Sequence, residues 1–152
     1  MTKESYVFQK VISDISPLVV DAKGLELTIV DPNTGAKRTV IDAMTGAAVG
    51  SLGHQDDEII DVMCQAARKN NYSFGLYLGN QASEDLARYI CDERSPKGHF
   101  SSALWVGSGS EANENAMKIA KQYHSEKGDT KRYKFISRVN SYHGFTIGAL
   151  SL

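Results

Sequence analysis

The sequence predicts an α/β protein in which a β-hairpin segment is followed by the start of a mainly parallel sheet. Two strand-like runs on either side of a tight turn predict the hairpin, and a strand–helix–strand pattern near the end of the chain predicts the parallel sheet. Residues 1–50 are expected to form an N-terminal segment that contains the hairpin, and residues 51–152 are expected to contain the start of the parallel sheet.

The hairpin is predicted from a five-residue turn. Residues 31–35 read Asp-Pro-Asn-Thr-Gly, and proline at the second position with glycine at the last is typical of a β-turn. Residues 24–30 and 37–41 flank this turn and are rich in β-branched side chains, as strands are. The small-residue run that follows, residues 43–53, is expected to lack regular structure.

Three helices are predicted after this run. Apolar residues recur at helical spacing in residues 56–69, where acids occupy the first turn and bases the last, as the helix dipole favours. A second helix is expected over residues 83–92. A third is expected over residues 110–127, with Gly128 placed to end it.

The parallel sheet is predicted from two apolar segments on either side of the third helix. Residues 102–106 read as a short strand with Trp105 in the core, and residues 133–136 read as the return strand. A right-handed crossover would make these strands parallel and adjacent. The turn at residues 107–110 would then lie at the carboxyl end of a strand, where ligands bind in open α/β sheets.

This turn is the first candidate site. Gly107-Ser108-Gly109-Ser110 leads into a helix, so backbone N–H groups and the positive end of the helix dipole point to one place and favour an anion such as phosphate. The second apolar segment is followed by Asn140-Ser141-Tyr142-His143-Gly144, which offers an aromatic face beside a turn. A phosphate cradle combined with an aromatic ring indicates a flat, phosphorylated cofactor.

The same turn has two other interpretations. Ser108-x-x-Glu111 is a capping box, which occurs at ordinary helix starts. Gly107, Gly109 and Ala112 also match the G-x-G-x-x-A form of the dinucleotide fingerprint. No acid follows at the end of the next strand, but Arg138 could receive a 2′-phosphate, so an NADP-linked oxidoreductase remains a distant alternative.

The composition argues against several partners. A net charge of −1 leaves no basic field for nucleic acid, and no apolar run approaches the roughly 18–20 residues that cross a bilayer. The first residues show no targeting pattern. Cys64 and Cys91 are too few for a disulfide framework, and no metal site is expected because the cysteines and histidines lack metal-ligand spacing. A cytoplasmic location is expected.

Three segments resemble the class III aminotransferases, the fold type I enzymes that depend on pyridoxal 5′-phosphate. Residues 42–54 resemble the family's D-x-x-x-G-x-x-V-x-x-L-G-H stretch. Residues 107–118 resemble its phosphate-binding turn and the helix after it, and residues 141–151 resemble its YHG-x-T-x-GALS segment. The three segments occur in the family's order. The resemblance implies that residues 1–50 are part of the small domain and that residues 51–152 are the truncated start of the large, cofactor-binding domain.

The resemblance implies roles for four residues. Gly109 and Ser110 would bind the cofactor phosphate, Tyr142 would stack on the pyridine ring, and His143 would shape the turn behind it. The substrates would be a small-molecule amino donor and acceptor, and the partner would be a second copy or a full-length relative.

The resemblance also implies what this chain does not contain. In the family, the Schiff-base lysine and the carboxylate at the pyridinium nitrogen follow the YHG segment. The chain is therefore expected to be an N-terminal portion of an aminotransferase, with no catalytic residue of its own and no activity alone. A non-catalytic dimerisation or interaction module is the competing interpretation.

Overall fold

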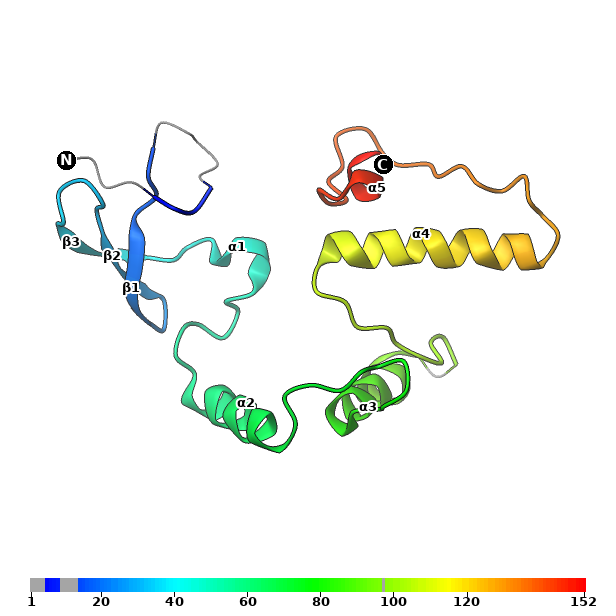
Figure 1. Ribbon diagram of the computed structural model, residues 1–152, viewed down its shortest axis with the longest axis horizontal. Helices are drawn as coiled ribbons and strands as arrows, with labels where there is room; N and C mark the ends of the chain where they lie inside the picture. The colour runs from blue at the N-terminus through cyan, green and yellow to red at the C-terminus, as the bar shows by residue number, and fades with distance from the viewer. Residues whose placement is uncertain (1–4, 9–13, 97) are drawn as a thin grey trace. The chain divides into compact units, whose positions relative to one another are not determined.

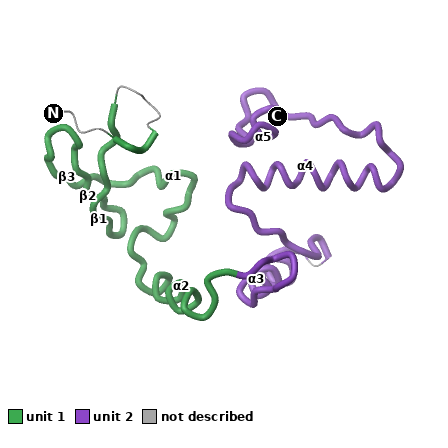
Figure 2. The backbone as a smooth tube through the Cα atoms, viewed as in Figure 1, with its two compact units in different colours: residues 1–72 green, residues 73–152 purple. Residues whose placement is uncertain are grey.

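The computed structural model describes residues 5–8, 14–96 and 98–152. The chain divides into two compact units, Met1–Tyr72 and Ser73–Leu152 (Figure 2). The expectation that the N-terminus carries no targeting segment falls in part on residues 1–4, which lie outside the described residues.

The first unit contains a three-stranded antiparallel sheet in the order β1-β2-β3 (Figure 1). Its strands are β1 (Leu18–Lys23), β2 (Glu26–Val30) and β3 (Lys37–Ile41). The predicted hairpin is confirmed as β2 and β3, whereas β1 was not predicted from the sequence. The first strand of the predicted hairpin also begins two residues later than expected, because Gly24, with φ of 56°, forms the turn between β1 and β2.

The turn between β2 and β3 is built on Asp31. Its carboxylate oxygen Oδ1 accepts hydrogen bonds from the backbone N–H groups of Asn33 (2.8 Å) and Thr34 (2.9 Å). These two bonds, that of Thr34 first, hold the pKa of Asp31 below its ordinary value. Gly35 takes a φ of 72°, a conformation that glycine adopts without strain. The residue types that predicted the turn therefore perform the expected local roles.

Two helices complete the first unit. α1 (Thr45–Ala48) is one irregular turn with non-helical dihedral angles inside it, within the small-residue run that was expected to lack regular structure. α2 (Asp57–Lys69) matches its predicted range, because Asp56 is the N-cap and its side chain accepts a hydrogen bond from Ile59 N–H at 3.1 Å. None of the residues of α2 is buried.

The second unit begins with a helix that changes its hydrogen-bonding pattern. α3 (Gln81–Arg88) continues directly into the π-helix η1 (Tyr89–Arg94). The helix begins two residues before the predicted start because the Asn80 side chain caps it, accepting hydrogen bonds from Ala82 and Ser83 N–H. Cys91 is the buried residue of this pair of elements.

The longest helix is α4 (Gly109–Glu126), close to its predicted range. Gly128 follows it with φ of 78°, as a glycine that ends a helix does. After a further connection, α5 (Ile147–Leu150) lies beside the first turns of α4 (Figure 1).

The α/β class is confirmed, but the prediction that residues 102–106 and 133–136 pair in a parallel sheet is wrong for the described residues. Residues 102–106 and 133–136 form no ladder, with each other or with any other described segment. Trp105, expected in the core, is 42% exposed. An isolated pair of strands is at best marginally stable in water, and parallel pairing is slightly weaker than antiparallel pairing. Without a third strand, the apolar segments on either side of α4 gain too little to pair.

The described residues bury little. Cys91 and Ala149 are the buried apolar residues, and Ser110 is the buried polar one. In the part of the chain that the structure describes, no helix is long and apolar enough to cross a membrane. The same residues bring no three potential metal-ligating side chains of His, Cys, Asp or Glu together.

Candidate functional site

The N-terminus of α4 is closed by two reciprocal hydrogen bonds. The Ser108 hydroxyl accepts from Glu111 N–H at 3.2 Å, and the Glu111 carboxylate accepts from Gly107 N–H at 2.6 Å. The predicted capping box therefore exists, with the difference that the glutamate returns to Gly107 rather than to Ser108 itself.

Two backbone donors remain at this helix end. The N–H groups of Gly109 and Ser110 have no acceptor among the described residues. They lie in the first turn of an 18-residue helix, where the dipole favours a negative charge by about 0.3–1 kcal/mol. A Cβ added to Gly109 would meet no atom within 4 Å, so a ligand can approach this backbone closely. The capping interactions and an anion site are thus compatible here.

Ser110 links this helix end to the second candidate segment. Its side chain is buried, and its Oγ accepts a hydrogen bond from Phe145 N–H at 3.1 Å. Gly144 is needed beside it: with φ of 139°, a Cβ at this position would lie 2.5 Å from Ser110 Oγ. The two segments predicted to converge therefore meet, although a helix–turn contact and not strand pairing brings them together.

Two further side chains of α4 bind the same segment. The Asn113 side-chain N–H donates to the carbonyl oxygen of His143. The Glu114 Oε1 accepts from the backbone N–H groups of Gly148 (2.8 Å) and Ala149 (3.3 Å). Together with Ser110, these residues attach α4 to a segment 30–35 residues away in the sequence.

The environment of Glu114 favours its charged form. The Thr146 hydroxyl has the largest influence, although its geometry falls short of a hydrogen bond, and the N–H groups of Gly148 and Ala149 act in the same direction. Lys118 adds a smaller Coulombic attraction. The pKa of Glu114 is therefore lowered from its ordinary value, despite a partial opposing effect of desolvation.

The two aromatic candidates differ in exposure. Tyr142 is 78% exposed, so its ring is available to cover a ligand. His143 is half-buried, and its Nε2 is buried without a hydrogen-bond partner among the described residues. An unpartnered buried nitrogen is uncommon, and a ligand that supplied a polar atom here would satisfy it.

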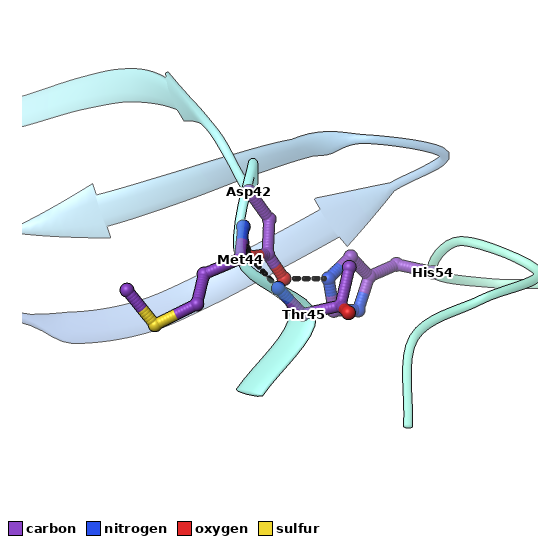
Figure 3. Close-up of polar contacts among 4 residues, drawn as sticks. All are labelled: Asp42, Met44, Thr45 and His54. Atoms are coloured by element: carbon purple, nitrogen blue, oxygen red, sulfur yellow. Dashed lines mark hydrogen bonds and ion pairs between the residues drawn. The ribbon is translucent and has the colours of Figure 1, made fainter. Parts of the chain in front are cut away.

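A separate polar cluster lies at the end of β3 in the first unit (Figure 3). The Asp42 carboxylate accepts from Thr45 N–H (2.8 Å) and Met44 N–H (3.2 Å), and it contacts His54 Nε2 at 3.1 Å. The Thr45 N–H and the His54 side chain, in that order, lower the pKa of Asp42. The His54 backbone also pairs with Gly24 in both directions. His54 therefore connects this turn to the sheet.

Sequence reasoning selected Gly109, Ser110, Tyr142 and His143 as candidates. It did not select Asn113 and Glu114, which attach α4 to the second candidate segment. The missed residues carry a signal that could have found them. They stand three and four positions after Ser110, so all three side chains share one face of α4. Polar residues at this spacing, in the first turns of a helix, indicate a helix face that binds another segment.

Comparisons with known proteins match nearly the whole chain. A family model described as aminotransferase class-III matches residues 13–152. The chain is 35% identical to the aminotransferase YodT of Bacillus subtilis, over 97% of this chain and 32% of that protein. It is also 35% identical to the aminotransferase C1771.03c of Schizosaccharomyces pombe, over 99% of this chain and 31% of that protein.

Solved structures show the same relationship. An amine transaminase from an uncultivated Pseudomonas species, with bound pyridoxal phosphate, matches 99% of this chain and 34% of its own, with a TM-score of 0.85; at 21% identity it supports the fold. A thermostable omega transaminase, 25% identical, matches 97% of this chain and 32% of its own, with a TM-score of 0.78.

The extent of the match defines the relationship. The chain spans about a third of the length of the curated relatives named above, at 31–32%. The matched family region also includes the Gly107–Ala112 turn, which leaves the dinucleotide-fingerprint interpretation without support. The chain belongs to the class III aminotransferases.

Proposed function

We propose that this chain provides the phosphate- and ring-binding part of a pyridoxal-phosphate-dependent aminotransferase. The reaction would transfer an amino group between an amine or amino acid and a keto or aldehyde acceptor. Family membership supports the reaction class. The observation that carries the proposal is the pair of unpartnered N–H groups of Gly109 and Ser110 at the start of α4, on the helix that binds the segment containing Tyr142.

The residues present fit this cofactor. Gly109 and Ser110 would bind the phosphate through backbone N–H groups, and the Ser110 hydroxyl, which accepts from Phe145, still has its own proton to donate. The exposed Tyr142 ring would cover the pyridine face. His143 would support the turn behind the ring, and its unpartnered Nε2 leaves a polar atom for the bound group.

The chemistry divides between the cofactor and the chain. When bound, the cofactor supplies an electron sink for the carbon that carries the amino group. The residues of this chain bind and orient it: the α4 N-terminus neutralises phosphate charge, and Tyr142 holds the ring plane and keeps water from one face. We propose that the reacting lysine lies outside these 152 residues, so that the chain alone has no transaminase activity.

The association of this chain is a second proposal. On α2, Ile59, Ile60 and Met63 are 43–65% exposed and stand on one helical face. We propose that apolar surface of this kind is covered in a homodimer or by a full-length relative, within the cytoplasm. Light scattering that reports a monodisperse monomer at high concentration would contradict this association.

We also propose that residues 1–50 belong to a small domain and that residues 51–152 belong to the start of the large domain.

Ligand binding tests the cofactor proposal directly. Pyridoxine 5′-phosphate is the suitable probe because it has no aldehyde and cannot react with surface lysines. We expect the full chain to bind it, inorganic phosphate to compete, and Tyr142→Ala to weaken it by about 2- to 10-fold without affecting inorganic phosphate. Tyr133→Ala, at an exposed aromatic outside the site, is the matched control. Binding that does not depend on the phosphate group would contradict the proposal.

A further inference from the structure

One face of α4 makes three different polar contacts with the segment 143–149. Ser110 Oγ accepts from Phe145 N–H, the Asn113 amide donates to the carbonyl of His143, and Glu114 Oε1 accepts from the N–H groups that begin α5. Because the helix face offers acceptors at Ser110 and Glu114 and a donor at Asn113, sliding the segment by one residue would break the set. The contacts therefore fix the register between the helix and the segment.

We propose that Asn113 and Glu114 are positioning residues that hold Tyr142 where its ring can cover a ligand bound at the α4 N-terminus. This role rests on the proposed function, because it concerns the same ligand. Asn113 binds the backbone of His143, the residue next to Tyr142. Glu114 binds the start of α5, which follows this segment in the sequence. Neither residue touches the ligand in this role; each acts through the backbone that carries Tyr142.

The closeness of the contacts shows that the segment is adapted to them. A Cβ on Gly148 would collide with the Glu114 carboxylate, and a Cβ on Gly144 would lie 2.9 Å from the Cβ of Ala149. Ala149 is 2% exposed, whereas Tyr142 is 78% exposed. The segment is thus held to α4 at Ala149 and at His143, while the ring of Tyr142 remains exposed.

This arrangement separates two parts of ligand binding. The Gly109 and Ser110 N–H groups belong to α4 itself and do not need the segment in order to bind phosphate. The aromatic contribution of Tyr142 does depend on the segment. Loss of the Glu114 contact should therefore weaken ring binding and leave phosphate binding intact, which a general loss of folding would not do.

The experiment compares four versions of the full chain: wild type, Glu114→Ala, Glu114→Gln and Glu126→Gln. Binding of inorganic phosphate and of pyridoxine 5′-phosphate is measured by calorimetry, and hydrogen exchange is measured at the Gly148 and Ala149 amides. We expect Glu114→Ala to lose protection at both amides and to weaken pyridoxine 5′-phosphate about 3- to 10-fold with phosphate unchanged. Glu114→Gln keeps an acceptor oxygen and should recover most of both. Glu126→Gln, on the same helix but outside the contact, should match wild type.

A double variant tests whether Glu114 acts through Tyr142. If it does, Glu114→Ala combined with Tyr142→Ala should bind pyridoxine 5′-phosphate no more weakly than Tyr142→Ala alone. Additive losses, or an equal loss of phosphate binding in Glu114→Ala, would overturn the positioning role while the proposed function stands. A wild-type chain that binds no pyridoxine 5′-phosphate would instead overturn the proposed function, and the positioning role with it.

Discussion

The sheet of the first unit and the two segments around α4 in the second unit both contain apolar runs, but they differ in backbone pairing. β1, β2 and β3 are joined by short turns, and each pairs with its neighbour in the sequence. Residues 102–106 and 133–136 are separated by an 18-residue helix and pair with no described segment. Antiparallel strands find their partners locally, whereas parallel strands need a long crossover and further strands beside them.

The carboxylates of the two units show the same contrast between local and distant contacts. In the first unit, Asp31 and Asp42 accept hydrogen bonds from N–H groups two or three residues further on. In the second unit, Glu114 accepts from N–H groups 34 and 35 residues away. The backbone contacts of Asp31 and Asp42 are thus local, whereas those of Glu114 hold distant segments together.

The largest effect is expected where a distant contact leaves no room for a side chain. Gly144→Ala would force an L-residue to φ of 139° and place its Cβ 2.5 Å from Ser110 Oγ. We expect a cost of roughly 2–4 kcal/mol and detachment of α5 from α4. Urea unfolding followed by circular dichroism measures the cost. Gly75→Ala is the control, because its Cβ would meet nothing within 4 Å and its φ is not positive; similar unfolding midpoints for both variants would contradict the prediction.

A smaller effect is expected for the equivalent change in the first unit. Gly53→Ala combines a φ of 81° with a Cβ 2.9 Å from the carbonyl oxygen of Gly24. The close contact should break the Gly24–His54 pairing and cost about 1–3 kcal/mol. Gly46→Ala separates the two causes, because Gly46 also has a positive φ but open space around it. If Gly46→Ala were as costly as Gly53→Ala, the dihedral angle alone would explain the loss.

The same contrast explains which features the sequence could predict. α2, α4 and the β2–β3 hairpin were predicted because their signals are local: a cap such as Asp56, a stop at Gly128, and the Asp31 turn. β1 was missed although it begins with the apolar run Leu18-Val19-Val20, because three such residues are a weak strand signal without the pairing partner. The prediction of parallel strands was wrong for a related reason: an apolar run shows that a strand can form, but it does not show that a second strand lies beside it.

The residues of the candidate site also differ in whether their sequence signal is local or depends on a distant segment. The Gly109–Ser110 turn and Tyr142 carry recognisable local chemistry, and the structure brings their two segments together. Asn113 and Glu114 were missed because their partners are backbone groups of a distant segment. Their spacing after Ser110 indicates a polar helix face, but it does not specify which segment that face contacts. Whether the four predicted residues bind the cofactor stays a prediction that the binding experiments address.

Hydrogen exchange would measure the difference in pairing without any substitution. The amides of β2, which is paired on both sides, should exchange at least about tenfold more slowly than those of residues 133–136. Exchange in an intact peptide backbone is slowed by hydrogen bonding, and residues 133–136 have no ladder partner in the described chain. Equal protection of the two regions would indicate that residues 133–136 pair in solution, for example with a second copy of the chain.

The smallest effect is expected from the local carboxylate cluster at Asp42. The Thr45 N–H and His54 lower its pKa below the ordinary value of 3.8. A lowered pKa means that the folded state binds the proton less readily, so this contribution is complete well above pH 3.8 and is lost as the pH falls through the lower, folded value. Asp42→Asn should therefore unfold the first unit slightly more easily at neutral pH and reduce its sensitivity to acid. Asp61→Asn, an exposed position on α2 in the same unit, is the matched control. An acid titration of the sheet signals by nuclear magnetic resonance measures both effects, and an unchanged acid profile in Asp42→Asn would show that Asp42 does not anchor the end of β3.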